Sequence, residues 1–162
     1  MAELRTAPKV RELCAADLGA VIAIDAAHTG ERDEGAWQRV FASYVAGAAV
    51  RRIDQAFAIG VDVDGALAGY LFGEVRTVEF GSDPAGWVFS VGVATEWQRR
   101  GVARALVDEA RRRFAALGVR HVRTMVRRND VAILSFFRSA GFVGGPFVQL
   151  EIELGTDQEN GS

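Results

Sequence analysis

The sequence predicts an α/β domain in which a mixed central sheet of about six to seven strands is flanked by about four helices. Apolar residues recur every three or four positions across 102–117, which is the spacing of an amphipathic helix. Apolar runs of strand length occupy 56–63, 66–75 and 87–91. With 162 residues and 49% hydrophobic content, the chain can build one compact core and requires no second domain.

The N-terminal part is expected to hold one short strand and two helices. Residues 10–13 have strand character, and helical spacing of apolar residues follows in 17–27. A second helix is expected over 34–46, with Trp37, Val40, Phe41 and Tyr44 on one side. The polar residues 28–33 form the loop between the two helices.

A hairpin is expected next, because the strands 56–63 and 66–75 are separated by the turn dipeptide Asp64-Gly65. The turn at 81–86 leads into the strand that ends near Val93. A helix over 102–117 follows, and Gly118 is suited to end it.

The remaining elements are a strand at 119–126, a short helix and a last strand. For the helix, Asn129 is the expected N-cap and Gly141 ends it. Residues 147–154 alternate between apolar and polar side chains, as a half-buried strand does. We expect one domain over 8–154 and a polar tail at 155–162.

Residues 91–106 carry the strongest functional signal, because a strand, a polar loop and an amphipathic helix follow one another there. The helix begins after Gly101, and its first turn leaves backbone N–H groups without partners inside the helix. The helix dipole and the flanking Arg99 and Arg100 also favour a phosphate or pyrophosphate. A Walker loop is excluded because Lys9 is the only lysine, and the glycines of a dinucleotide fingerprint are missing.

Two motifs of this chain resemble the acyl-CoA-binding signatures of the GNAT N-acetyltransferase superfamily. Gln98-x-x-Gly101-x-Ala103 is similar to the first signature, Q/R-x-x-G-x-G/A. The segment 129–142 resembles the second, N-x-x-A-x-x-F-Y-x-x-x-G-F, with one strand between the two motifs. The order of the expected elements also matches the GNAT fold over essentially the whole chain.

The resemblance implies an N-acetyltransferase that moves an acetyl group from acetyl-CoA directly to an amine in a ternary complex. It implies that the strand ending at Val93 separates from the strand ending near residue 126, so that its freed backbone pairs with the pantetheine arm. The amide of Val91 or Gly92 would polarise the thioester carbonyl. The implied acetyl-CoA-binding residues are Val91, Gly92, Val93, Gln98, Arg99, Arg100, Gly101, Val102, Ala103, Arg104, Asn129, Phe136 and Phe137.

The chain departs from the family pattern at both catalytic positions. Phe137 stands where a tyrosine commonly protonates the leaving thiolate. Phe89 and Ser90 occupy the strand that in many members carries a glutamate as general base. Because both groups are missing, a catalytically silent acyl-CoA-binding or sensing domain is the alternative.

We select Glu79 as the candidate general base. Removing a proton at pH 7 costs about 4.6 kcal/mol for a lysine-like amine but only about 1 kcal/mol for an α-amine, so a weak base suits the second kind. The acceptor itself is not identified. The other candidate bases are Glu74, Glu31, Asp33, Glu34 and His28.

Composition argues against other classes of function. The formal charge of −2 gives no basic footprint for nucleic acid, although arginines cluster at 111–113 and 120–128. Cys14 is the only cysteine and is expected to be buried; with two histidines it makes a metal site unexpected. Neither a signal peptide nor a membrane-length apolar run is found, so a cytoplasmic location is expected. The alternating last strand offers an edge for a homodimer.

Overall fold

The computed structural model describes residues 8–45, 55–77 and 81–155. The chain is divided into two compact units, residues 1–127 and residues 128–162, and each is described by itself. None of the helices in these described ranges is long and apolar enough to cross a membrane.

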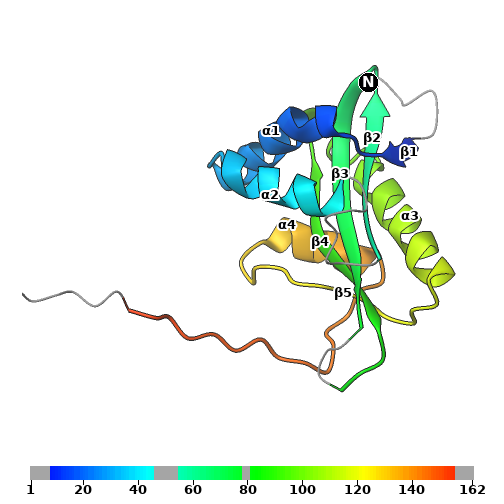
Figure 1. Ribbon diagram of the computed structural model, residues 1–162, viewed down its shortest axis with the longest axis vertical. Coiled ribbons are helices and arrows are strands. Elements are labelled where there is room, and N and C mark those ends of the chain that lie inside the picture. Colours follow the sequence, from blue (N-terminus) through cyan, green and yellow to red (C-terminus); the bar gives the residue numbers. More distant parts are fainter. Residues whose placement is uncertain (1–7, 46–54, 78–80, 156–162) are drawn as a thin grey trace, which may run out of the picture. The chain divides into compact units, whose positions relative to one another are not determined.

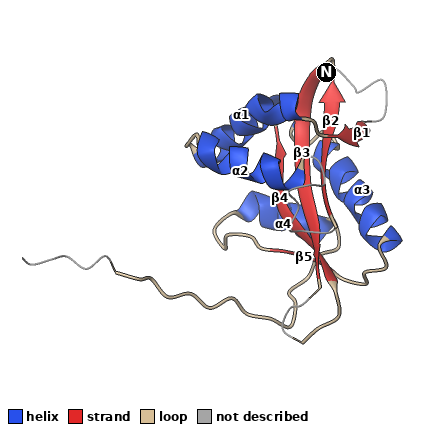
Figure 2. Ribbon diagram, in the orientation of Figure 1, coloured by secondary structure: helices blue, strands red, loops and turns tan. Residues whose placement is uncertain are grey.

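The first unit contains all five strands of the described chain and three of its four α-helices. Figure 2 shows the strands side by side, with helices on both faces of the sheet. The elements are β1 (Lys9–Glu12), α1 (Leu18–Thr29), α2 (Glu34–Tyr44), β2 (Ala56–Val63), β3 (Ala66–Arg76), β4 (Ala85–Val93), α3 (Val102–Ala116) and β5 (Val122–Thr124), with short 3₁₀ turns η1 (Ala15–Asp17) and η3 (Thr95–Trp97).

The sheet is mixed, as the sequence predicts. Its order is β1-β2-β3-β4-β5; the first four strands are antiparallel to their neighbours, and β5 runs parallel to β4. The parallel pairing follows from the connection, because α3 carries the chain back to the starting end of β4 before β5 begins (Figure 1).

Alternating side chains of β3 divide the core into two layers. Tyr70 and Phe72 point to one face, where the ring of Trp37 on α2 lies 5.5 Å from each of theirs. Gly73 faces the other way, and a Cβ at this position would lie 3.0 Å from the ring of Phe114 on α3. Helices α1 and α2 therefore cover one face of the sheet and α3 covers the other (Figure 1).

Local turn chemistry is confirmed where the sequence indicates it. Asp64 and Gly65 both have positive φ, 52° and 79°, which joins β2 to β3 through a tight two-residue turn. Gly118 follows α3 with a φ of 79°, the left-handed conformation that ends many helices.

The predicted last strand is wrong. Residues 147–154 form no strand, and the exposed fractions of Val148, Leu150, Ile152 and Leu154 range from 77% to 90%. The chain therefore has five strands in its described part, not six to seven. Alternation gives a segment one apolar face, but a strand forms only where a neighbouring strand takes its backbone hydrogen bonds.

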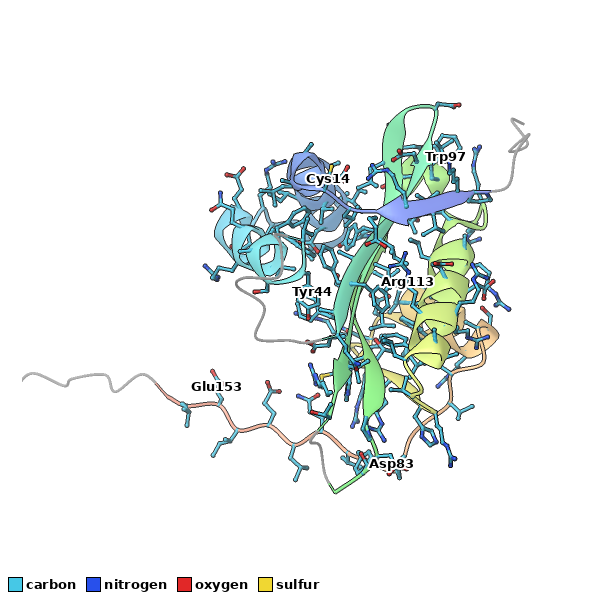
Figure 3. The ribbon with its side chains drawn as sticks, turned by 45° about the vertical axis from the view of Figure 1, so that its right-hand side comes forward. Cys14, Tyr44, Asp83, Trp97, Arg113 and Glu153 are labelled. Atoms are coloured by element: carbon cyan, nitrogen blue, oxygen red, sulfur yellow. The ribbon has the colours of Figure 1, made fainter. Side chains whose placement is uncertain are left out.

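Three smaller predictions also need correction. The strand expected at 119–126 is limited to Val122–Thr124. The N-cap of α4 (Val131–Ser139) is Asp130 instead of Asn129, because the carboxylate of Asp130 accepts a hydrogen bond from the Ile133 amide at 3.1 Å. Cys14 is exposed, not buried, because it stands before η1, where its N–H donates to the Asp17 carboxylate (Figure 3).

Candidate active site

The strands β4 and β5 separate halfway along β4. They are paired only from Gly86, opposite Val122, to Val88, opposite Thr124. From Ser90 to Val93, β4 keeps its pairing with β3, and from Phe89 to Val93 it has no strand partner on its other side among the described residues. The separation leaves one edge of β4 open over residues 89–93, where the backbone can pair with another extended chain.

The direction of the backbone groups along this edge follows from one hydrogen bond. The Ala94 amide donates to the Ala68 carbonyl at 2.8 Å, so the polar groups of Ala94 point toward β3. Because these directions alternate along an antiparallel strand, the groups of Gly92 also point toward β3, and those of Val91 and Val93 point to the open edge.

The open edge leads directly into the turn that begins α3. Arg99 adopts a left-handed φ of 59°, which is uncommon for a residue with a side chain. Gly101 is the N-cap with a φ of 82°; it has no side chain for the helix amides, and its carbonyl accepts from Ala105 at 3.0 Å. The first turn of α3 therefore directs its N–H groups out of the helix end, where an anion can accept from them.

Val102 fixes the position of this helix end against the sheet. Its side chain is 1% exposed, and a Cβ added to Gly69 of β3 would lie 2.8 Å from its Cγ1 atom. Such close packing places the α3 N-terminus beside the start of β3 and the end of β4.

The arginines of the turn have local partners of their own. The Arg100 guanidinium lies 5.3 Å from the centre of the Trp97 ring, and Arg104 lies 3.6 Å from Asp108. Exposed pairs of this kind are individually weak.

The carbonyl of Val93 is already engaged by the protein. His28 Nε2 lies 2.9 Å from this oxygen, and the Gln98 amide nitrogen lies 3.4 Å from it. Because a carbonyl only accepts hydrogen bonds, the His28 Nε2 atom carries its hydrogen in this contact. Gln98, which the family motif implies for acetyl-CoA, thus stabilises the end of β4.

Glu74 is buried on the α2 face of β3. Its side-chain carboxylate accepts a hydrogen bond from Arg76 Nε at 2.8 Å and another from the Tyr44 hydroxyl. Burial, together with the negative charge of Glu74, raises the pKa of Tyr44 well above its usual range, so this hydroxyl remains a donor. Sequence reasoning included Glu74 as a candidate base but missed the hydrogen bond that occupies it.

A hydrogen-bonded pair of hydroxyl groups, from Ser90 and Tyr70, lies next to the open edge, because Ser90 directly precedes Val91. Ser90 of β4 is hydrogen-bonded to Tyr70 of β3, which is 1% exposed. Burial raises the pKa of Tyr70 to about 12. Nothing in the sequence alone indicates that Ser90 has this partner.

The remaining candidate bases differ in their surroundings. Asp33 caps α2 by accepting from the Ala36 amide at 2.9 Å, and Glu34 lies 3.5 Å from Arg32. Glu31 is exposed in the same loop, and its carbonyl accepts a hydrogen bond from the Thr29 hydroxyl. Glu79 lies outside the described residues.

The second unit holds the other motif residues. Asn129 precedes α4, and Phe136 and Phe137 lie on it, with ring centres 5.3 Å apart. Phe137 is 4% exposed, and its ring centre lies 5.0 Å from that of Phe142. The chain turns back after α4 through Gly141, whose φ is 96°, as predicted.

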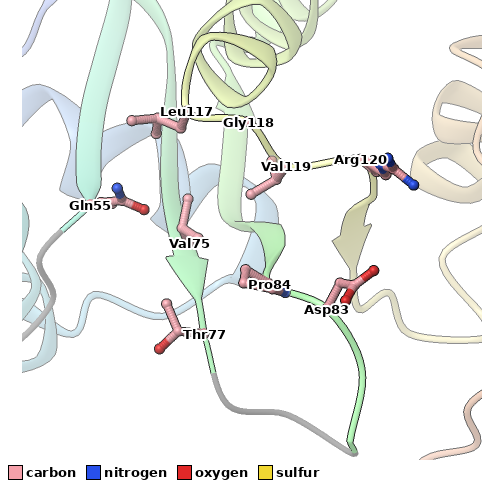
Figure 4. A pocket seen from close by; sticks show the side chains of 9 residues that line it. All are labelled: Gln55, Val75, Thr77, Asp83, Pro84, Leu117, Gly118, Val119 and Arg120. Carbon is pink, nitrogen blue, oxygen red and sulfur yellow. The ribbon is translucent and has the colours of Figure 1, made fainter.

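A pocket of about 420 Å³ lies at the other end of the sheet. Figure 4 shows it between the end of β3 at Val75, the residues before β4, including Pro84, and the end of α3 at Leu117. Val93 and the α3 N-terminus are at the opposite ends of β4 and α3, so this pocket is separate from the open edge.

Comparison with known proteins identifies the class. The family model described as the acetyltransferase (GNAT) family matches residues 21–142. The chain therefore belongs to the GNAT acetyltransferase family. A search of curated proteins found no match.

Solved structures with similar folds come from several acetyltransferases. An aminoglycoside acetyltransferase from an uncultured soil metagenomic sample, in complex with sisomicin, has a TM-score of 0.68 and 18% identity, covering 91% of this chain and 97% of that one. The aminoglycoside N-acetyltransferase AAC(6')-Iy in complex with CoA has a TM-score of 0.76 and 14% identity, covering 94% and 99%. A ribosomal-protein-alanine N-acetyltransferase from Brucella melitensis biovar Abortus 2308 has a TM-score of 0.72 and 16% identity, covering 92% and 100%.

Proposed function

We propose that this chain transfers an acetyl group from acetyl-CoA to a primary amine, directly and within a ternary complex. The observation that carries this proposal is the open edge of β4, which leads from Phe89 to Val93 and then into the uncapped start of α3. The pantetheine arm of acetyl-CoA is extended, carries amide groups and ends in a pyrophosphate. These groups match the order of hydrogen-bond donors and acceptors along the open edge and the helix start.

The described residues fit the parts of acetyl-CoA in order. The polar groups of Val91 face the open edge and suit the amides of the pantetheine arm or the thioester carbonyl. The amides that follow Gly101 suit the pyrophosphate, with Arg99, Arg100 and Arg104 adding charge. In the second unit, Asn129, Phe136 and Phe137 are proposed to flank the thiol end, as the family motif implies.

The acetyl donor supplies an activated acyl group, and the chain must orient the amine and accept its proton. Glu79 stays our predicted base; it follows Arg76, the last residue of β3, by three positions. Glu74 is less suited, because Arg76 and Tyr44 already bond its carboxylate. Weak base catalysis is compatible with amines that are partly unprotonated near neutral pH.

A catalytically silent acyl-CoA-binding domain is the second candidate, and Phe137 in place of the expected tyrosine favours it. Release of free thiol from acetyl-CoA, measured with a panel of primary amines, separates the two. The proposed enzyme releases thiol only when an amine is added, and Gly101→Val removes that release. Tight CoA binding without thiol release from any amine would favour the silent domain.

Three further predictions from the sequence concern domain organisation, location and assembly. They are one domain over 8–154, a cytoplasmic location and a homodimer. The exposed apolar side chains of Val148, Leu150 and Ile152 support association of two copies. Light scattering of the full chain and of Leu150→Lys checks this, because a dimer built on this segment becomes a monomer in the variant.

A further inference from the structure

The middle of β4 carries an aromatic side chain beside the open edge. Phe89 lies at a β-bulge, because Ser90 is opposite Phe72 and Val88 is opposite Gly73, which leaves Phe89 without a partner on β3. Its side chain is 49% exposed, although β4 is an interior strand of the sheet. Only one residue separates it from Val91, whose amide faces the open edge.

Tyr44 of α2, which is 7% exposed, packs against the ring of Phe89. Its ring is nearly parallel to that of Phe89, with an interplanar angle of 20° and ring centres 5.7 Å apart. Its other contacts keep the ring fixed, because it packs edge-on against Phe72 at 5.5 Å and its hydroxyl donates to Glu74. Figure 3 shows Tyr44 beside the strands, at the end of α2. The two rings therefore form an apolar wall, exposed through Phe89 and here called the Tyr44–Phe89 wall.

The charges next to the wall are balanced. Glu74 is 6% exposed and bonds Arg76, whose guanidinium in turn lies 4.4 Å above the Trp87 ring. Glu74, the carboxylate that bonds the Tyr44 hydroxyl, is therefore covered and paired. A polycationic acceptor requires several exposed carboxylates, whereas a flat apolar group requires an exposed ring such as Phe89.

We propose that the acceptor is an amine with an aromatic body, which packs on the Tyr44–Phe89 wall while its amino group reaches the acetyl group beside Val91. This proposal rests on the proposed acetyl transfer. It separates this chain from its structural neighbours of the aminoglycoside class, whose similarity of 14% to 18% identity shows the fold alone. No substrate other than acetyl-CoA and the amine takes part. The amine nitrogen forms the new bond to the acetyl carbon, the carbon–sulfur bond breaks and its electron pair leaves on the sulfur of the CoA thiolate, and the amine proton passes to the proposed base Glu79 or to water.

The test compares 2-phenylethylamine, propylamine and kanamycin A as acceptors for the full chain with acetyl-CoA. The ring of 2-phenylethylamine is expected to raise kcat/KM about ten- to hundredfold over propylamine, and kanamycin A is expected to be the poorest. Phe89→Ala should remove most of the ring's advantage. Leu117→Ala, which truncates an apolar side chain that is 41% exposed at the far end of α3, should retain it.

Calorimetric titration of the same amines into the CoA-saturated protein separates this inference from the proposed function. If 2-phenylethylamine binds best and Phe89→Ala weakens it, the acceptor inference stands even where no thiol is released, and only the proposed transfer fails. Equal values for the three amines, a preference for kanamycin A, or unchanged selectivity in Phe89→Ala would each overturn the acceptor inference.

Discussion

His28 Nε2 lies 2.9 Å from the carbonyl oxygen of Val93, a hydrogen bond that connects the last turn of α1 to the last residue of β4. The two residues are 65 positions apart, and the bond holds the end of the open edge in place. Since this nitrogen donates, it is not the atom that accepts a proton from the acceptor amine.

The first prediction concerns this bond. His28→Ala should lower the free energy of unfolding by about 1 kcal/mol, the typical net contribution of one hydrogen bond. The pH dependence of kcat should keep its shape, because His28 acts on the position of β4. Urea denaturation and a pH–rate profile are the measurements. A pH–rate profile whose shape changes in the variant would show instead that His28 is the base.

The second prediction concerns the start of α3. CoA should raise the melting temperature more than dephosphorylated pantetheine does, because the amides after Gly101 bind a charged pyrophosphate and each such bond is worth about 1.5–3 kcal/mol. A thermal-shift titration of both compounds is the measurement. Equal shifts would refute a phosphate site at this helix end.

The third prediction compares neighbouring residues of this turn. A Cβ at Gly101 meets no atom within 4 Å, but its φ of 82° makes a side chain strained, so Gly101→Val should cost about 1–2 kcal/mol of stability. It should abolish CoA binding, because the added carbons occupy the approach of the pyrophosphate. Val102→Ala should lose about 1–3 kcal/mol of stability and keep CoA binding, since Val102 is buried. Melting curves and CoA titrations of both variants decide whether Gly101 is at the site.

Features set by neighbouring residues could be predicted from the sequence. The hairpin at Asp64-Gly65 and the end of α3 at Gly118 follow from φ values that glycine and aspartate adopt readily. The helix over 102–117 follows from its apolar periodicity, and the turn before it from its position between a strand and that helix.

Contacts between distant residues could not be predicted in this way. The stacking of Tyr44 on Phe89 and the hydrogen bond from Tyr44 to Glu74 depend on how α2 lies across the sheet. Residues 147–154 have the alternation of a strand, yet their pairing depends on an edge elsewhere, which no local pattern encodes. For the same reason Glu74 was considered as a free base although its partners hold it.

The fourth prediction concerns acid stability. Arg11 bonds Asp17 at 2.8 and 2.9 Å, and these bonds lower the pKa of Asp17 to about 2. The unfolded chain therefore binds a proton at a higher pH than the folded chain does, so acid destabilises the fold as pH falls from about 4 to about 2. At neutral pH Asp17→Asn should cost up to about 2 kcal/mol, and its stability should depend less on pH in this range. Denaturation at pH 7, 4 and 2.5 measures both effects, and parallel pH curves for the two proteins would contradict the assignment.

The last prediction concerns the missing general acid. Phe137 occupies the tyrosine position of the family motif, and its ring is buried between Phe136 and Phe142 at 5.3 and 5.0 Å. A thiol with a pKa of about 8.5 leaves readily without a protein acid, so Phe137→Tyr should change kcat by less than about tenfold. A positioned acid typically contributes about 10²–10⁴. Steady-state kinetics with one accepted amine compares the two proteins, and Phe136→Tyr on the same helix controls for the added hydroxyl. A thousandfold gain in Phe137→Tyr alone would mean that the position has acid geometry and that the natural chain has lost catalysis, which favours the silent binding domain.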